Sequence, residues 1–315
     1  MTDWPTERME RERVVRYADL RPCLNAFIDT RNPGSEAKEN FTIIGPGVSE
    51  NPAQHVHIAE PHGFNIGGAR QPPGCVNSQH SHDTAEVFIV HTGRWRFTLG
   101  EEGSDASVEC GPGDVISLPT GMFRGFSCVP QHEGDAEPAY LFAVLGGDDP
   151  GRVLWAPYVF DMAENFGLVL LANGDLVDTT AGQQVPANID RMPRTSPEQV
   201  ERLHVPTNAE AEDLVVRHDA GEGTYAEAII GEAGPLDWQH GFFVDRLVIQ
   251  PGEEIIPLAP EAPEVLFVQQ GALKVSWADG ELELGEGDTM TVPIGLDRRL
   301  SSSGGCIAFL VSGDA

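Results

Sequence analysis

The chain has 315 residues, of which 49 are acidic and 20 are basic, giving a formal net charge of −29 at pH 7. Such an acidic surface excludes nucleic acid and anionic membranes as expected partners, because both would be repelled. The N-terminus is too polar for a signal peptide, and no apolar run approaches the roughly 18 residues of a membrane span, so a soluble cytoplasmic protein is predicted.

The composition favours a β-rich fold in two domains. Glycine (35 residues) and proline (24 residues) are abundant, as in proteins built from many short strands joined by turns. The length suits two domains of about 100–150 residues each. The five cysteines are scattered and include no Cys-x-x-Cys pair, which argues against a disulfide framework or a structural zinc site and favours a reducing compartment.

In chain order, residues 1–40 are expected to form an N-terminal extension. Its charged stretch, 7–16, reads as a short helix or as a strand entering a sheet. Strand-like segments then occupy 41–150, where β-branched and aromatic residues are frequent. After a linker, a second strand-rich domain is expected over 210–315.

The linker, 151–209, is expected to contain short helices. One is predicted over 158–165, after Pro157. Another begins at 196–199, where Ser, Pro and Gln occupy the N-cap, N1 and N3 positions of a capping box. The stretch 168–190 between them is expected to be irregular or a hairpin around an Asn-Gly pair.

The most informative segment is 74–93, which holds two histidines and a carboxylate between two glycines. His80 and His82 are two residues apart, so on a strand they point to the same face. Glu86 keeps this parity if the three residues before it only bend the chain. Two imidazoles and a carboxylate suit Fe(II), Mn(II), Ni(II), Cu(II) or Zn(II) rather than Ca(II). One divalent transition metal is therefore predicted at these three residues, with iron or manganese favoured.

The segment resembles the first signature motif of the cupin superfamily: Gly, five residues, His-x-His, three residues, Glu, six residues, Gly. The second cupin motif follows about twenty residues later, with its turn residues in place: Gly113, Pro119 and Gly121. It departs from the family at Arg124, where cupins normally carry a fourth metal-binding histidine, and at Cys128, where they usually carry Asn. The resemblance implies a jelly-roll barrel (a double-stranded β-helix) over 41–150 that holds the metal.

Both motifs recur in the C-terminal half. Segment 252–271 repeats the first motif at the same spacing, with Glu264 retained and with Leu258 and Pro260 in place of the two histidines. The second motif recurs with Arg298 at the histidine position. A single long-period duplication means two copies of one domain. The chain therefore resembles a bicupin, an all-β protein of two cupin barrels, whose second barrel is degenerate and metal-free.

Three arrangements of Arg124 are open at this point. In the first, Arg124 is a catalytic residue that enters the barrel beside the metal and binds a carboxylate or enolate oxygen of the substrate through its two-pronged donor group. In the second, it pairs with Glu86 and leaves a weak or vacant metal site. In the third, it faces outward. His57, before the first motif, is retained as an additional candidate ligand in place of the missing histidine, and His91 has the strand parity that points away from the site.

The leading interpretation is a metal-dependent enzyme that acts on a small anionic organic molecule in the N-terminal barrel, with no residue assigned to an organic cofactor. Bicupins of similar layout include ring-cleaving dioxygenases, oxalate-degrading enzymes and flavonol-type dioxygenases, so the resemblance implies a dioxygenase-like oxidoreductase. A cupin isomerase or lyase and a non-catalytic binding or storage bicupin are the alternatives, since a fold alone does not choose among them. A homo-oligomer is compatible with each.

Overall fold

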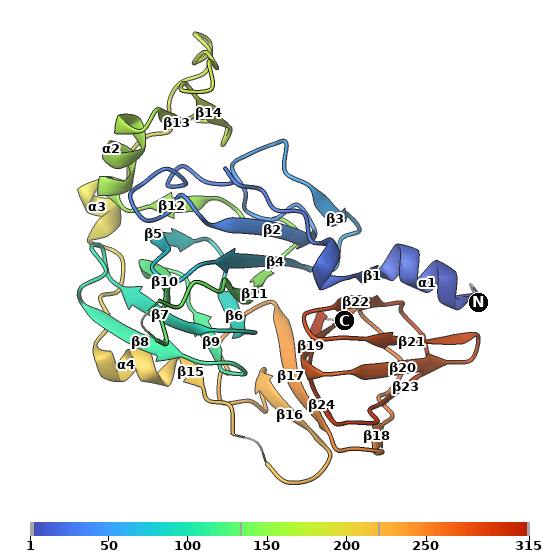
Figure 1. The fold of residues 1–315 in the computed structure, drawn as a ribbon. Coiled ribbons are helices and arrows are strands. Elements are labelled where there is room, and N and C mark those ends of the chain that lie inside the picture. Colours follow the sequence, from blue (N-terminus) through green and yellow to red (C-terminus); the bar gives the residue numbers. More distant parts are fainter. Residues whose placement is uncertain (1–2, 133, 220, 314–315) are drawn as a thin grey trace.

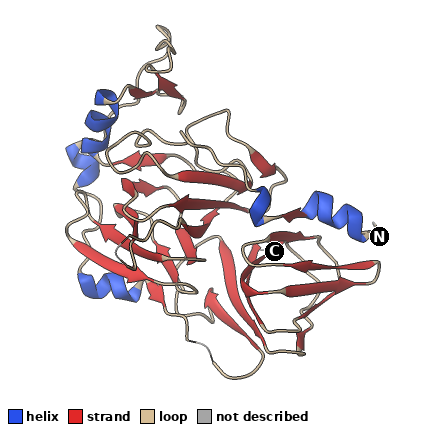
Figure 2. Ribbon diagram, viewed as in Figure 1, coloured by secondary structure: helices blue, strands red, loops and turns tan. Residues whose placement is uncertain are grey.

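The computed structural model describes residues 3–132, 134–219 and 221–313, which fold into two β-barrels packed side by side (Figure 1). Strands make up most of the regular structure, and the helices lie at the periphery (Figure 2). The prediction of two all-β barrels with short helices between them is confirmed. No helix among the described residues has the length and apolarity that a membrane span requires.

Two sheets form the first barrel. Their strands are β2 Glu39–Ile44, β3 Val56–Ile58, β4 Phe64–Gln71, β5 Val76–His82, β6 Glu86–Val90, β7 Arg94–Leu99, β8 Ala106–Cys110, β9 Val115–Leu118, β10 Arg124–Val129, β11 Ala139–Gly146, β12 Val153–Trp155 and β15 Val215–Val216. The larger sheet has the order β15-β9-β6-β11-β4-β2-β3, and the smaller has the order β12-β5-β10-β7-β8. Neighbouring strands are antiparallel except for β2 and β3, which are parallel.

The second barrel is also built from two sheets. Its strands are β1 Val14–Val15, β16 Tyr225–Ile230, β17 Phe242–Ile249, β18 Glu254–Ile255, β19 Glu264–Gly271, β20 Leu273–Trp277, β21 Gly280–Leu284, β22 Thr289–Val292, β23 Arg298–Ser301 and β24 Cys306–Gly313. The larger sheet has the order β1-β22-β19-β24-β17-β16, and the smaller has the order β18-β23-β20-β21.

The remaining elements are helices and one hairpin: α1 Thr6–Arg13, the 3-10 helix η1 Tyr17–Asp19, α2 Pro157–Asn165, α3 Pro197–Val200, α4 Asn208–Asp213, and the paired strands β13 Leu168–Leu170 and β14 Leu176–Asp178. The predicted capping box is present at α3, where the Ser196 side chain accepts from the Gln199 N–H and the Gln199 side chain accepts from the Ser196 N–H. Within 168–190, β13 and β14 form the predicted hairpin around the Asn-Gly pair, and residues 179–190 form turns and loops.

Each barrel receives a short edge strand from outside its own segment. In the N-terminal extension, α1 leads into β1, which pairs with β22 of the second barrel. Strand β15 lies within the range expected for the second barrel, yet it pairs with β9 of the first. The charged stretch is thus both a helix and a strand. A two-residue strand carries no periodic signal, so its sheet is chosen by tertiary pairing alone.

The two barrels share a hydrophobic core. One cluster of buried side chains combines residues of β2, β4, β6, β9 and β11 with residues of β16, β17, β19 and β24. At its centre the ring of Phe142 stacks on that of Phe267, with centroids 4.1 Å apart. The larger sheets of both barrels therefore face each other.

Burial on both faces of β6 positions the candidate site. Phe88 and Val90 pack inside the first barrel, whereas Val87 and Ile89 belong to the core shared with the second barrel. A one-residue slip would exchange these two sets, so the register is strongly specified. Glu86 has the parity of Phe88 and Val90 and is buried, which directs its carboxylate into the first barrel.

Candidate metal centre

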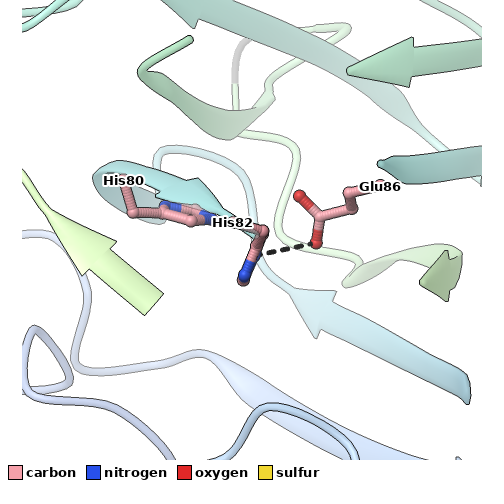
Figure 3. Close-up of side chains that lie close together, drawn as sticks. All are labelled: His80, His82 and Glu86. Carbon is pink, nitrogen blue, oxygen red and sulfur yellow. Dashed lines mark ion pairs between the residues drawn. The ribbon is translucent and has the colours of Figure 1, made fainter. Parts of the chain in front are cut away.

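The two predicted histidines and the predicted glutamate meet inside the first barrel. His80 and His82 end strand β5, and Glu86 begins β6 after a short turn. Figure 3 shows the three side chains directed toward one another. One potential ligand atom from each lies within 4.8 Å of the others, and all three residues are buried. The arrangement brings together the two imidazoles and one carboxylate that the spacing predicted.

Hydrogen bonds orient the imidazoles. Nδ1 of His80 lies 2.7 Å from the carbonyl oxygen of Ser78, which can only accept, so Nδ1 carries the proton and Nε2 keeps its lone pair. Metal-binding histidines are commonly held in this way by a second partner on the far nitrogen. Nε2 of His82 lies 3.5 Å from Oε1 of Glu86. Nδ1 of His82 is buried and has no hydrogen-bond partner within the described residues.

The protonation states also suit a metal. Burial lowers the pKa of His80 to about 3, with the charges of His82 and Arg124 adding to the effect, and burial lowers the pKa of His82 as well. Burial alone would raise the pKa of Glu86, but the charges of His82 and Arg124 outweigh it, and the pKa lies below its usual value. Neutral imidazoles and an ionised carboxylate are the forms that coordinate metal ions.

Arg124 is fully buried and bonded within the protein. Its Nε and Nη2 both donate to Oε2 of Glu86 at 3.2 Å, and its Nη1 donates to the carbonyl oxygen of Met122 at 3.3 Å. Of the three arrangements left open by the sequence, the structure shows the ion pair with Glu86, and the outward orientation is wrong. The parity that sends this side chain inward also places it beside the nearest acceptor. Direct contact with a substrate stays a prediction.

The same ion pair recurs in the second barrel. Nη2 of Arg298 bonds Oε2 of Glu264, and Nη1 of Arg298 donates to the carbonyl oxygen of Leu258 at 2.9 Å. The Leu258 side chain is 91% exposed. Within the described residues, only the first barrel holds a cluster of three metal-ligating side chains. Since the arginine–glutamate pair exists without histidines, it belongs to the barrel architecture rather than to metal chemistry alone.

His57, the additional candidate ligand, does not lie at the site. His57 lies on the edge strand β3, its Nε2 accepts from the backbone N–H of Arg21 at 3.2 Å, and its ring packs against His55. His91 points away from the site, as its parity predicted, and packs against Phe267.

A cavity of about 80 Å³ adjoins the cluster and is lined by His80, His82 and Glu86. Two of its walls were not predicted. Trp155 of β12 pairs with β5 opposite His80 and packs its ring against that imidazole, with centroids 5.3 Å apart. The other wall is formed by the stretch before β2, which includes Lys38. Neither Trp155 nor Lys38 lies in a recognisable sequence motif, so only the tertiary structure could show that they line the cavity.

Comparison with known proteins identifies the fold. Neither a protein-family model nor a curated protein matches the sequence. Among solved structures, the oxalate decarboxylase of Lactobacillus farciminis in a formate complex is 14% identical with a TM-score of 0.57, covering 96% of this chain and 86% of that one. A deletion mutant of Bacillus subtilis oxalate decarboxylase is 13% identical with a TM-score of 0.55, covering 96% and 77%.

A further structure of the Bacillus subtilis enzyme, determined in a study of its Mn(II) centres, is 12% identical with a TM-score of 0.55, again covering 96% and 77%. At these identities the likeness concerns the fold. The fold is that of a two-barrel cupin, as the motif pair predicted. Within it, the first barrel holds a group of side chains able to bind a metal ion.

Proposed function

We propose that the first barrel binds one divalent transition metal through His80, His82 and Glu86 and acts as an enzyme on a small anionic organic molecule. The observation that supports this most strongly is the buried three-residue cluster facing a cavity. Among the described residues, Nε2 of His80 makes no hydrogen bond, and Arg124 bonds Oε2 of Glu86 but not Oε1. The residues present therefore fit a metal ion.

A metal held by two histidines and one carboxylate would keep open positions and supply Lewis-acid or redox chemistry. The protein's own residues orient the candidate ligands and fix their protonation states. The two hydrogen bonds from Arg124 hold Glu86 in one orientation and keep it ionised, and the ring of Trp155 limits the movement of His80. Because the ligands are buried, water is largely excluded and electrostatic interactions in the cavity are strengthened.

Within this proposal, a dioxygenase-like oxidoreductase is the first candidate, since two histidines and a carboxylate are the ligand set of non-haem iron oxygenases. A lyase is the second, and the structural likeness to oxalate decarboxylases favours it. A non-catalytic small-molecule-binding bicupin is a third candidate. The ion pair between Arg124 and Glu86 favours that last function, because it satisfies the carboxylate without a metal.

The test combines metal analysis with turnover. The purified chain would be reconstituted with Fe(II) or Mn(II), and its metal content would be measured together with O₂ uptake and CO₂ release over a panel of small carboxylic acids. We expect one metal per chain, since Leu258 and Pro260 occupy the ligand positions of the second barrel. O₂ uptake would identify the oxidoreductase and CO₂ release without O₂ uptake the lyase. Ligand binding without turnover would identify the binding protein, and failure to retain any metal would overturn the proposal.

A further inference from the structure

We propose that Lys38 is the residue that binds the carboxylate of a small organic acid in the cavity beside His80, His82 and Glu86. This inference rests on the proposed function of the same site and adds the substrate class and the group that selects it. Lys38 lies outside both motifs, at the end of the stretch that leads into β2, and its side chain lines the cavity that also contacts the three candidate ligands.

The first observation is the burial of the Lys38 ammonium group. Lys38 is 1% exposed, and the one hydrogen bond that Nζ makes in the described structure is to Oδ1 of Asp29, itself fully buried. An ammonium group has three N–H donors. The others are shut off from bulk water, and an unmet buried donor is costly. The cavity is the place where they can meet an acceptor.

Another residue of the cavity lining, Asn40, carries an unmet donor. Nδ2 of Asn40, two residues after Lys38, is buried and has no hydrogen-bond partner among the described residues. A carboxylate has two oxygens and only accepts hydrogen bonds. It is therefore the ligand that complements a cation and an amide donor with vacant N–H groups.

The ammonium group is tied to the strand of candidate metal ligands. Oδ2 of Asp29 accepts from the backbone N–H of Ser78 at 2.9 Å, and the carbonyl oxygen of the same Ser78 lies 2.7 Å from Nδ1 of His80. The Ser35 hydroxyl further anchors the stretch by donating to the carbonyl oxygen of Val76 at 2.6 Å. This chain of contacts sets Lys38 at a defined place relative to His80.

Lys38 is better suited than Arg124 to receive an anion. The three nitrogens of Arg124 already donate within the protein, and Arg124 does not line the cavity. The other walls are largely apolar, with the rings of Phe88 and Phe126 among them. A cavity of about 80 Å³ admits a compact acid rather than a polymer. The expected ligand is thus a short carboxylic acid whose charged end meets Lys38.

The test uses matched acids and amides. Acetate, oxalate and pyruvate, with acetamide, oxamide and pyruvamide as neutral counterparts, would be titrated into the Mn(II)-loaded and the metal-free chain by calorimetry. We expect at least one acid to bind the wild type about ten- to a hundredfold more tightly than its amide, the range for a hydrogen bond to a charged group. Lys38→Met should lose this preference while keeping its Mn(II) content.

Two further variants separate recognition from stability. Lys38→Met leaves Asp29 unpaired, so Asp29→Asn/Lys38→Met provides a neutral pair that should fold and still lack the preference. Asp29→Asn alone frees the ammonium group and should bind the acid as tightly as the wild type or more tightly, whereas a purely structural ion pair predicts a loss. A wild type without acid preference, or a double variant that keeps it, would overturn the inference. Failure of the wild type to retain Mn(II) would instead overturn the proposed function. In that case the titrations of the metal-free chain would still test whether Lys38 binds the acid.

Discussion

Replacing Arg124 with methionine is expected to destabilise the metal-free protein and to tighten metal binding at the same time. The substitution keeps much of the side-chain volume but removes both hydrogen bonds to Oε2 of Glu86. The carboxylate is then buried beside the two neutral imidazoles of His80 and His82, without a cation to balance its charge. Removing one partner of a buried ion pair costs about 3–5 kcal/mol, because it leaves an uncompensated charge. A bound divalent metal would supply that compensation.

The gain in affinity follows from charge. At an effective dielectric constant of about 20, two unit charges roughly 6 Å apart interact by about 3 kcal/mol. The positive charge of Arg124 therefore opposes a metal beside Glu86, and its removal should strengthen Mn(II) binding at least about tenfold. Stability would be followed by thermal unfolding with chelator and with Mn(II), and affinity by calorimetry.

The second barrel provides the control for this experiment. Arg298→Met breaks the equivalent pair with Glu264, where histidines are replaced by Leu258 and Pro260. It should lower the melting temperature of the chelated protein, and Mn(II), bound at the unchanged first barrel, should raise that temperature by the same amount as in the wild type. The reasoning would be refuted if Arg124→Met left the chelated protein as stable as the wild type, or if it bound Mn(II) more weakly.

Three other predictions concern the ligands, a buried acid and the interface. His80→Ala/His82→Ala should abolish Mn(II) retention after dialysis while leaving the circular dichroism spectrum unchanged, and full occupancy would contradict the site. Burial raises the pKa of Glu50 to about 8 despite the hydrogen bond from Trp155. The folded protein therefore holds a proton on Glu50 that the unfolded chain, with a pKa near 4.3, releases. This proton stabilises the fold fully below about pH 4.3, and its contribution is lost as the pH rises toward 8, at up to about 1.4 kcal/mol per pH unit. Glu50→Gln should flatten that part of the pH profile of denaturant unfolding, and an unchanged slope would show that no such proton is held. Phe142→Ala, which removes the stacked ring between the barrels, should cost about 3–5 kcal/mol in the same assay, and a loss below about 1 kcal/mol would mean that the barrels are joined by other contacts.

Much of the candidate site could be predicted because its signals are local. The two-residue spacing of His80 and His82 sets their common face on β5, whatever the rest of the chain does. The glycines of the motifs likewise mark turns through a local property, the backbone conformation of a single residue. Gly113 and Gly121 have φ values of 85° and 74°, which other residues rarely adopt. The duplicated motif likewise predicted two barrels without reference to any long-range contact.

The partners of the charged side chains could not be predicted in this way. Strand parity favours an inward Arg124, but the sequence left open whether it would meet a substrate, pair with Glu86 or face outward. Lys38 and Asp29 form a buried pair although neither lies in a motif. Which acceptor a long side chain reaches depends on how strands and loops far apart in the chain pack together, and many weak contacts rather than residue spacing set that packing.

The sequence by itself therefore determined the two-barrel architecture, the grouping of His80, His82 and Glu86 as candidate metal ligands, and the absence of matching histidines in the second copy, since each follows from residue type and short-range geometry. Only the tertiary structure decided which barrel each edge strand joins, which acceptor Arg124 bonds, and that Lys38 lines the cavity. These outcomes depend on distances between residues far apart in the chain, which the packing of the two barrels sets.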